Sequence, residues 1–274
     1  MPDSFRGIFR EAFELYNGLA AVATGLMIAV GCFVLLIAKL SEPWQTILAV
    51  ILVAIILLSP PALLLLAWSH ANRKRQGEAL ALAYSLGLQY SHNDLLGIPK
   101  RFAKFGVFSR STESEAWDVL WGRYGGRMAT TFNCQHHEQR GTAGSTGEFS
   151  AAVLTCDRPF TGLLIRPETV ADRVPGAGGI TFESAEFNRN FFVQSPDRKF
   201  AYDVIAPKMM EYLLANPGWS FELAGYDAMI WTGKLWPAEK FEESLKVLMG
   251  FLNRIPDHVW KELGAERAAE PAGR

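Results

Sequence analysis

The sequence predicts an α+β protein: an N-terminal hairpin of two transmembrane helices, followed by a cytoplasmic domain with an antiparallel sheet and segregated helices. Three observations support this prediction. Two long stretches, residues 18–38 and 46–68, contain no Asp, Glu, Lys or Arg. The rest of the chain holds β-rich runs separated by Gly-rich turns, a pattern typical of hairpins. Its helical patterns stand apart from these runs, which argues against a doubly wound nucleotide-binding fold.

Each uncharged stretch is long enough to cross a bilayer as a helix, since about 20 residues span a hydrocarbon layer roughly 30 Å thick. The strongly apolar residues of the first stretch contribute roughly −3 to −6 kcal/mol on insertion scales, and no charge opposes them. Two buried helices of a soluble protein would show a polar face at helical spacing, and neither stretch does. The connection at residues 39–45 is too short for a domain and should form a tight turn.

Basic residues set the expected orientation. Arg6 and Arg10 precede the first span and residues 73–75 (RKR) follow the second, whereas the connection contains only Lys39. Because Lys and Arg are retained on the cytoplasmic side, both termini should be cytoplasmic. We therefore expect a multi-pass protein of the inner (plasma) membrane. The same basic string either presses the domain onto anionic lipid or only stops membrane transfer.

The residues before the first span show a second membrane signal. Residues 1–17 place aromatic and aliphatic side chains at helical spacing, with charged residues on the other side. Such a segment is expected to be an amphipathic helix in the headgroup region. The alternative is a continuation of the first span that packs on the soluble domain. Within the span, Ala21, Gly25 and Ala29 form a small-residue strip that would allow close helix approach.

Residues 69–263 are enough for one cytoplasmic domain, and residues 264–274 have the composition of a disordered tail. The expected strands are residues 116–122, 127–136, 148–156, 163–166, 187–194, 219–223 and 228–232. We expect turns at residues 124–126 and 225–227, and a flexible loop at 141–147. The expected helices are residues 76–85, a short one near Pro99, one from Ser195 broken at Pro207 and stopped after Asn216, and one from Pro237 redirected at Pro256.

Composition excludes some functions. The formal net charge is −1, so the sequence shows no nucleic-acid footprint.

Cys134, His136 and Cys156 are the candidate metal ligands, since zinc binds this set of side chains. Their spacing matches no CxxC pair, so we expect buried thiols, solvated histidines and no metal site. The cytosol is reducing, which favours free thiols over a disulfide.

One part of the chain resembles a known family. Residues 186–197 (EFNRNFFVQSPD), followed by Ala201 and residues 206–211 (APKMME), resemble bacterial membrane proteins grouped as domain of unknown function 3137. The turn at 122–126 (GRYGG) and the preceding hydrophobic pair are similar to that family's layout. This resemblance implies a membrane-tethered cytoplasmic domain. It implies no catalytic residues, because none are established for the family.

No catalytic or cofactor-binding residue is predicted. Residues 176–179 lack the strand-turn-helix context of a dinucleotide fingerprint, and Gly233-Lys234 lacks the rest of a phosphate loop. The tryptophans should be mostly core, with one or two lining a groove. We therefore expect a membrane-anchored binding, scaffold or sensor module with a protein partner or self-association. The alternatives are a membrane-tethered enzyme whose site comes from residues distant in sequence, and a subunit that assembles through its hairpin.

Overall fold

The structure is a computed structural model that describes residues 47, 72–109, 113–140, 143–173 and 178–269. The chain divides into two compact units, Met1–Ala71 and Asn72–Arg274. The predicted amphipathic helix at residues 1–17 and the predicted hairpin at residues 18–68 lie outside the described residues, apart from Ile47. In the described part of the chain, no helix is both long enough and apolar enough to span a membrane.

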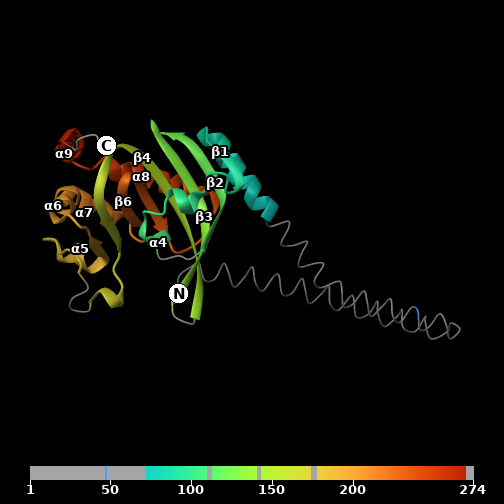
Figure 1. Cartoon of the computed structure of the whole chain (residues 1–274), viewed down its shortest axis with the longest axis horizontal. Helices are drawn as coiled ribbons and strands as arrows, with labels where there is room; N and C mark the ends of the chain where they lie inside the picture. The colour runs from blue at the N-terminus through green and yellow to red at the C-terminus, as the bar shows by residue number, and fades with distance from the viewer. Residues whose placement is uncertain (1–46, 48–71, 110–112, 141–142, 174–177, 270–274) are drawn as a thin grey trace. The chain divides into compact units, whose positions relative to one another are not determined.

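The second unit is an α+β domain built on an antiparallel sheet, which confirms the predicted class (Figure 1). Its strands are β1 (Gln89–Asn93), β2 (Glu113–Tyr124), β3 (Arg127–Arg140), β4 (Ala143–Pro167), β5 (Phe191–Gln194) and β6 (Ser220–Thr232). They follow the order β1-β2-β3-β4-β5, and β6 pairs with β4. The long strand β4 is therefore the centre of the sheet.

The hairpin between β2 and β3 has the predicted two-residue turn. Tyr124 pairs with Arg127, and Gly125 and Gly126 between them have φ values of 55° and 84°. Two positive φ values define a type I′ turn, which glycine adopts without strain. A Cβ at Gly125 would also lie 2.7 Å from the Cε of Met249. The turn therefore needs glycine for both its conformation and its packing.

The prediction of a flexible loop at residues 141–147 was largely wrong. The pairing of β3 with β4 continues as far as Arg140 and Ala143. Gly147 suggested a loop, but a Cβ at this position would lie 2.6 Å from the Cε1 of His136. The glycine therefore makes room for an imidazole within a paired strand.

Two other predicted breaks are also absent. The strands expected at 148–156 and 163–166 are parts of β4, and those at 219–223 and 228–232 are parts of β6. The register between β4 and β6 shifts around Phe160, which pairs with Gly225 at φ 51°. Such irregularities absorb extra residues and bend a strand without ending it.

The helices follow most of the predicted boundaries. They are residues 72–86, α3 (Ile98–Arg101), α4 (Gly106–Ser109), α5 (Ala185–Asn190), α6 (Arg198–Val204), α7 (Pro207–Ala215), α8 (Ala238–Leu252) and α9 (Asp257–Ala269), with a 3₁₀ turn η1 at Val170–Arg173. The first helix ends at Gly87, whose φ is 66°, and Pro207 separates α6 from α7, as predicted. Pro237 caps α8, and a second piece follows Pro256, as expected.

Three helix predictions need correction. The strand expected at residues 187–194 begins only at Phe191, because Ser184 caps α5 by accepting a hydrogen bond from the N–H of Phe187 at 3.1 Å. The cap of α6 is Asp197 and not Ser195, whose hydroxyl instead donates to the carbonyl of Gly162 at 2.6 Å. Helix α9 extends to Ala269, so the segment predicted to be a disordered tail begins as helix.

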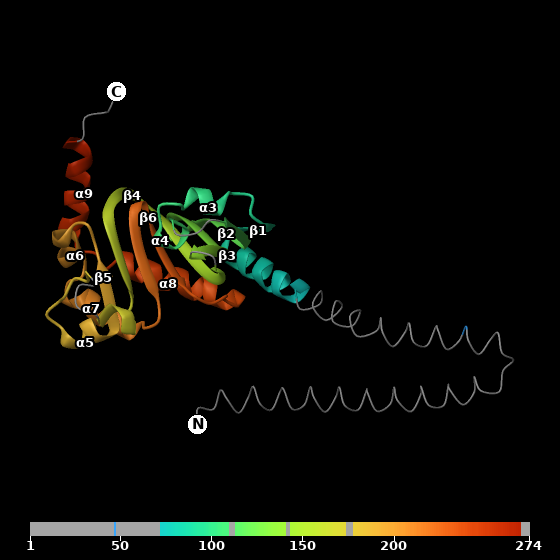
Figure 2. The same ribbon diagram turned by 60° about the horizontal axis from the view of Figure 1, so that its bottom comes forward.

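The sheet is covered on both faces, and the two layers differ in size (Figure 2). Ala152 and Leu154 of β4 pack in a large cluster with the helix at residues 72–86, α8 and the C-terminal helices. Ala151 and Val153 pack in a smaller cluster with α3 and α4. Successive strand residues point to opposite faces, so these two clusters lie on the two sides of the sheet.

Candidate functional site

Strand β2 contains an unusual residue at its centre. Asp118 has a φ of 49°, and no other non-glycine residue in the described part of the chain has a positive φ. It lies where the register between β2 and β3 shifts, between Trp117 and Leu120. This left-handed conformation costs L-residues roughly 1–2 kcal/mol, and aspartate is one of the few that visit it. Such strain persists only where the surrounding structure enforces it, and it concentrates at functional sites.

The carboxylate of Asp118 is buried and receives hydrogen bonds from the helix at residues 72–86, from β1 and from β3. Asp118 is 2 % exposed. Its Oδ2 accepts from Nη2 of Arg75, on the helix at residues 72–86, at 2.8 Å. Its Oδ1 accepts from the hydroxyl of Tyr90 at 2.9 Å and lies 2.8 Å from Nδ1 of His92, both on β1. The buried charge is thus paired and hydrogen-bonded, as such charges must be.

These partners control ionisation at the site. Burial by itself raises the pKa of Asp118, but the hydrogen bonds from Arg75, His92 and Tyr90 outweigh it and hold the pKa below its ordinary value of 3.8. Burial and the neighbouring carboxylate of Asp118 raise the pKa of Tyr90. At neutral pH the carboxylate is therefore charged and the phenol remains a donor.

A chain of hydrogen bonds continues from Asp118 across the sheet. Nδ2 of Asn133 on β3 donates to Oδ2 of Asp118 at 3.4 Å. The hydroxyl of Ser150 on β4 donates to Oδ1 of Asn133, and the backbone N–H of Trp236 donates to that hydroxyl at 2.9 Å. Asn133 and Ser150 are 1 % and 0 % exposed. We call the set Arg75, Tyr90, His92, Asp118, Asn133 and Ser150 the Asp118 network.

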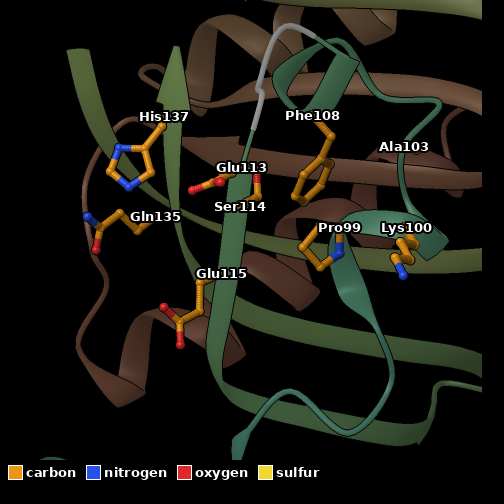
Figure 3. Close-up of a pocket in the computed structure, with 9 residues that line it drawn as sticks. All are labelled: Pro99, Lys100, Ala103, Phe108, Glu113, Ser114, Glu115, Gln135 and His137. Atoms are coloured by element: carbon orange, nitrogen blue, oxygen red, sulfur yellow. The ribbon is translucent and has the colours of Figure 1, made fainter. Parts of the chain in front are cut away.

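A groove opens beside the first residues of the same strand (Figure 3). Its volume is about 720 Å³. The wall from α3, α4 and the turn between them is largely apolar, and β2 and β3 supply polar side chains. The lining residues are Pro99, Lys100, Ala103, Phe108, Glu113, Ser114, Glu115, Gln135 and His137.

The polar residues of the groove are neighbours across the β2–β3 ladder. Glu113 pairs with His137, and Glu115 pairs with Gln135. In Figure 3 the two carboxylates point to the side of β2 on which Gln135 and His137 lie, while Phe108 lies on the opposite side. The groove therefore has two sides, with carboxylate, amide and imidazole groups on one side of β2 and the apolar surface of Phe108 on the other.

The apolar wall is held in place by specific contacts. The carboxylate of Asp94 accepts from the N–H groups of Leu96 and Ile98, at 3.0 and 2.7 Å, and so fixes the turn into α3. Lys104 donates to Asp227 of β6 at 2.6 Å, and the N–H of Gly106 donates to Glu222 at 2.8 Å. Three phenylalanines anchor the layer to the sheet: Phe102, Phe105 and Phe108.

The structure separates the candidate metal ligands. Cys134 belongs to the smaller cluster and Cys156 to the larger one, so the two thiols lie on opposite faces of the sheet. Both cysteines are buried and free. Burial raises the pKa of Cys134 to about 12 and that of Cys156 to about 11, which disfavours the thiolates that bind metals. Among the described residues there is no group of three or more potential metal ligands.

The described tryptophans pack mainly in or against the core, as predicted, but none of those described lines the groove, where one or two were expected. Trp219 and Trp236 are each 4 % exposed, and Trp121, Trp231 and Trp260 pack partly buried against the clusters. Sequence reasoning assigned no role to Asp118 or Phe108. A charged residue inside the apolar run of β2 was the available signal for Asp118.

Comparisons with known proteins add little. No protein-family model matches the chain, and no curated protein is similar to it at a significant level. One solved structure to which the chain shows similarity is the crystal structure of the mycobacterial trehalose monomycolate transport factor A, TtfA. The identity is 14 %, the TM-score is 0.49, and the match covers 67 % of this chain and 97 % of that one. A likeness of this degree carries no argument about function.

Proposed function

We propose that this chain is a membrane-anchored protein whose domain at residues 72–269 acts as a cytoplasmic binding module for a protein segment. The two uncharged stretches at residues 18–38 and 46–68 support the anchor. The excess of Lys and Arg before the first stretch and after the second supports a cytoplasmic domain.

The groove beside β2 is the observation that supports binding. Its volume of about 720 Å³ is within the range of known ligand sites, roughly 300–1,000 Å³. An apolar wall with a polar rim is the usual composition of a recognition surface. The two carboxylates and Lys100 favour a partner that brings both charges together with an apolar side chain.

Site-specific photo-crosslinking in native membranes tests this proposal. A benzophenone amino acid at Gln135 places the reactive group in the groove, and the same residue at Glu211, exposed on α7, is the matched control. We expect light-dependent adducts from position 135 that do not form from position 211. A second variant, Ala103→Arg, fills the groove and should weaken the adducts about tenfold, which corresponds to ~1.4 kcal/mol of binding free energy.

Two results would contradict the binding role. One is the same set of adducts from both positions, because this would indicate non-specific contact. The other is an Ala103→Arg variant that is crosslinked from position 135 as strongly as the parent protein.

A further inference from the structure

The helix at residues 72–86 is attached to the sheet unevenly along its length. Its second half is fixed by apolar packing, since Ala79 and Ala83 are 3 % and 1 % exposed and Leu82 and Leu86 pack against the same cluster. In residues 72–78, by contrast, no side chain is buried. The contact of Arg75 with Asp118 joins this first half to the sheet.

A second ion pair among the described residues of these turns lies within the helix itself. Lys74 lies 3.9 Å from Glu78 on the same helix, with both side chains largely exposed. Such a pair stabilises the helix itself by only about 0.2–0.5 kcal/mol. It does not hold the helix in place.

The acceptor of Arg75 is rigid. Asp118 is fixed by the bulge in β2, by Tyr90 and His92 on β1, and by Asn133 on β3. Arg75 is the permanently charged donor among these, and its side chain remains 41 % exposed. The guanidinium group of Arg75 can therefore move into solvent, whereas the carboxylate of Asp118 cannot.

We propose that Arg75 and Asp118 form a latch between the first described turns of this helix and the sheet. With the latch closed, the first turns of the helix lie against the sheet. With the latch open, these turns separate from the sheet while Ala79 and Ala83 keep the second half in place. Asn72 is the first described residue of this helix and the first residue of the second unit.

The hydrogen bonds of Asp118 also extend across the sheet. From Asp118 the hydrogen bonds run through Asn133 and Ser150 to the backbone of Trp236, one residue before the cap of α8. These bonds hold Asp118 in place, so the part of the latch that moves is the helix at residues 72–86. The latch goes beyond the proposed binding role and does not depend on it.

Hydrogen exchange measured on the full chain in lipid nanodiscs tests the latch. The variants are Arg75→Gln and Asp118→Asn, and Arg73→Gln, which changes an exposed charge on the same helix, is the matched control. Exchange reports local opening of a helix without global unfolding. We expect the amides of residues 75–79 to exchange at least ~10-fold faster in both latch variants, with the amides of α8 and of the Arg73→Gln variant unchanged.

Unchanged exchange at residues 75–79 in Arg75→Gln would overturn the proposal. So would equal acceleration in α8, because this would indicate loss of global stability. If Asp118→Asn does not fold, Arg75→Gln decides the question by itself, since it alters a partly exposed side chain.

Discussion

At the scale of single residues, Asp118 combines a left-handed backbone, nearly complete burial and a negative charge. Each property alone is unfavourable, and the bonds from Arg75, Tyr90 and His92 offset the cost. Removing one partner of a buried ion pair is more destabilising than replacing the whole pair by apolar side chains, because it leaves a buried charge without compensation. Stability should therefore depend on the ionisation of this one group.

The Asp118→Asn variant tests this dependence on pH. Asparagine keeps the shape and tolerates the left-handed conformation, so the variant removes mainly the charge. Because folding lowers the pKa of Asp118, its carboxylate stabilises the fold above the ordinary pKa of 3.8, and this contribution disappears as the pH falls below that value. At pH 7 we expect the variant to lose about 1–3 kcal/mol of unfolding free energy.

Urea unfolding of both proteins between pH 3 and pH 7 measures the effect. The difference between them should shrink as the pH falls through the acidic end of this range. A difference that is constant with pH would show that charge at Asp118 does not stabilise the fold.

At the scale of elements, α8 is the main cover of the larger face of the sheet. Its buried side chains recur at helical spacing and include Phe241, Leu245, Leu248 and Leu252. Phe251 of the same helix stacks on Phe221 of β6, with ring centroids 4.8 Å apart. The position of α8 should therefore depend on the fit of these side chains.

Truncation within α8 tests this packing. Leu245 is 0 % exposed, so Leu245→Ala should lower the unfolding free energy by about 2–5 kcal/mol through lost burial and a cavity. The adjacent exposed variant, Lys246→Ala, should change it by less than about 0.5 kcal/mol. Denaturant titration compares the two variants, and equal effects would argue that α8 does not form the core.

Element ends could be predicted where a single residue acts locally. Gly87, Pro207 and Pro256 stop or redirect helices through their own backbone geometry, and each acted as expected. Strand ends could not be predicted in the same way. Gly147 and Gly225 lie in stretches with the composition of turns. They nevertheless belong to strands, because β3 pairs with β4 and β4 pairs with β6 at these positions.

The candidate site could not be predicted from the sequence, for a related reason. The groove brings together Pro99, Phe108 and Gln135, which are separated along the chain and meet only because α3 and α4 fold over β2 and β3. Similarly, the residues around Asp118 form an apolar run that predicts an ordinary strand. The bulge that buries its carboxylate depends on register with β3, which local sequence does not encode.

At the scale of the whole molecule, the α+β class could be predicted because hairpin and helix patterns are strong in this sequence. In the proposed function, residues 1–71 anchor the chain and residues 72–269 bind a partner. The two units of the chain meet between Ala71 and Asn72, next to the proposed latch. Anchoring is the central claim of the proposed function, because it places the binding domain at a membrane.

Fractionation of cells that produce the full chain tests anchoring directly. After an alkaline wash and ultracentrifugation, the account predicts that the protein sediments with the membranes and enters the supernatant only after detergent is added. Protein that remains in the supernatant without detergent would contradict the account.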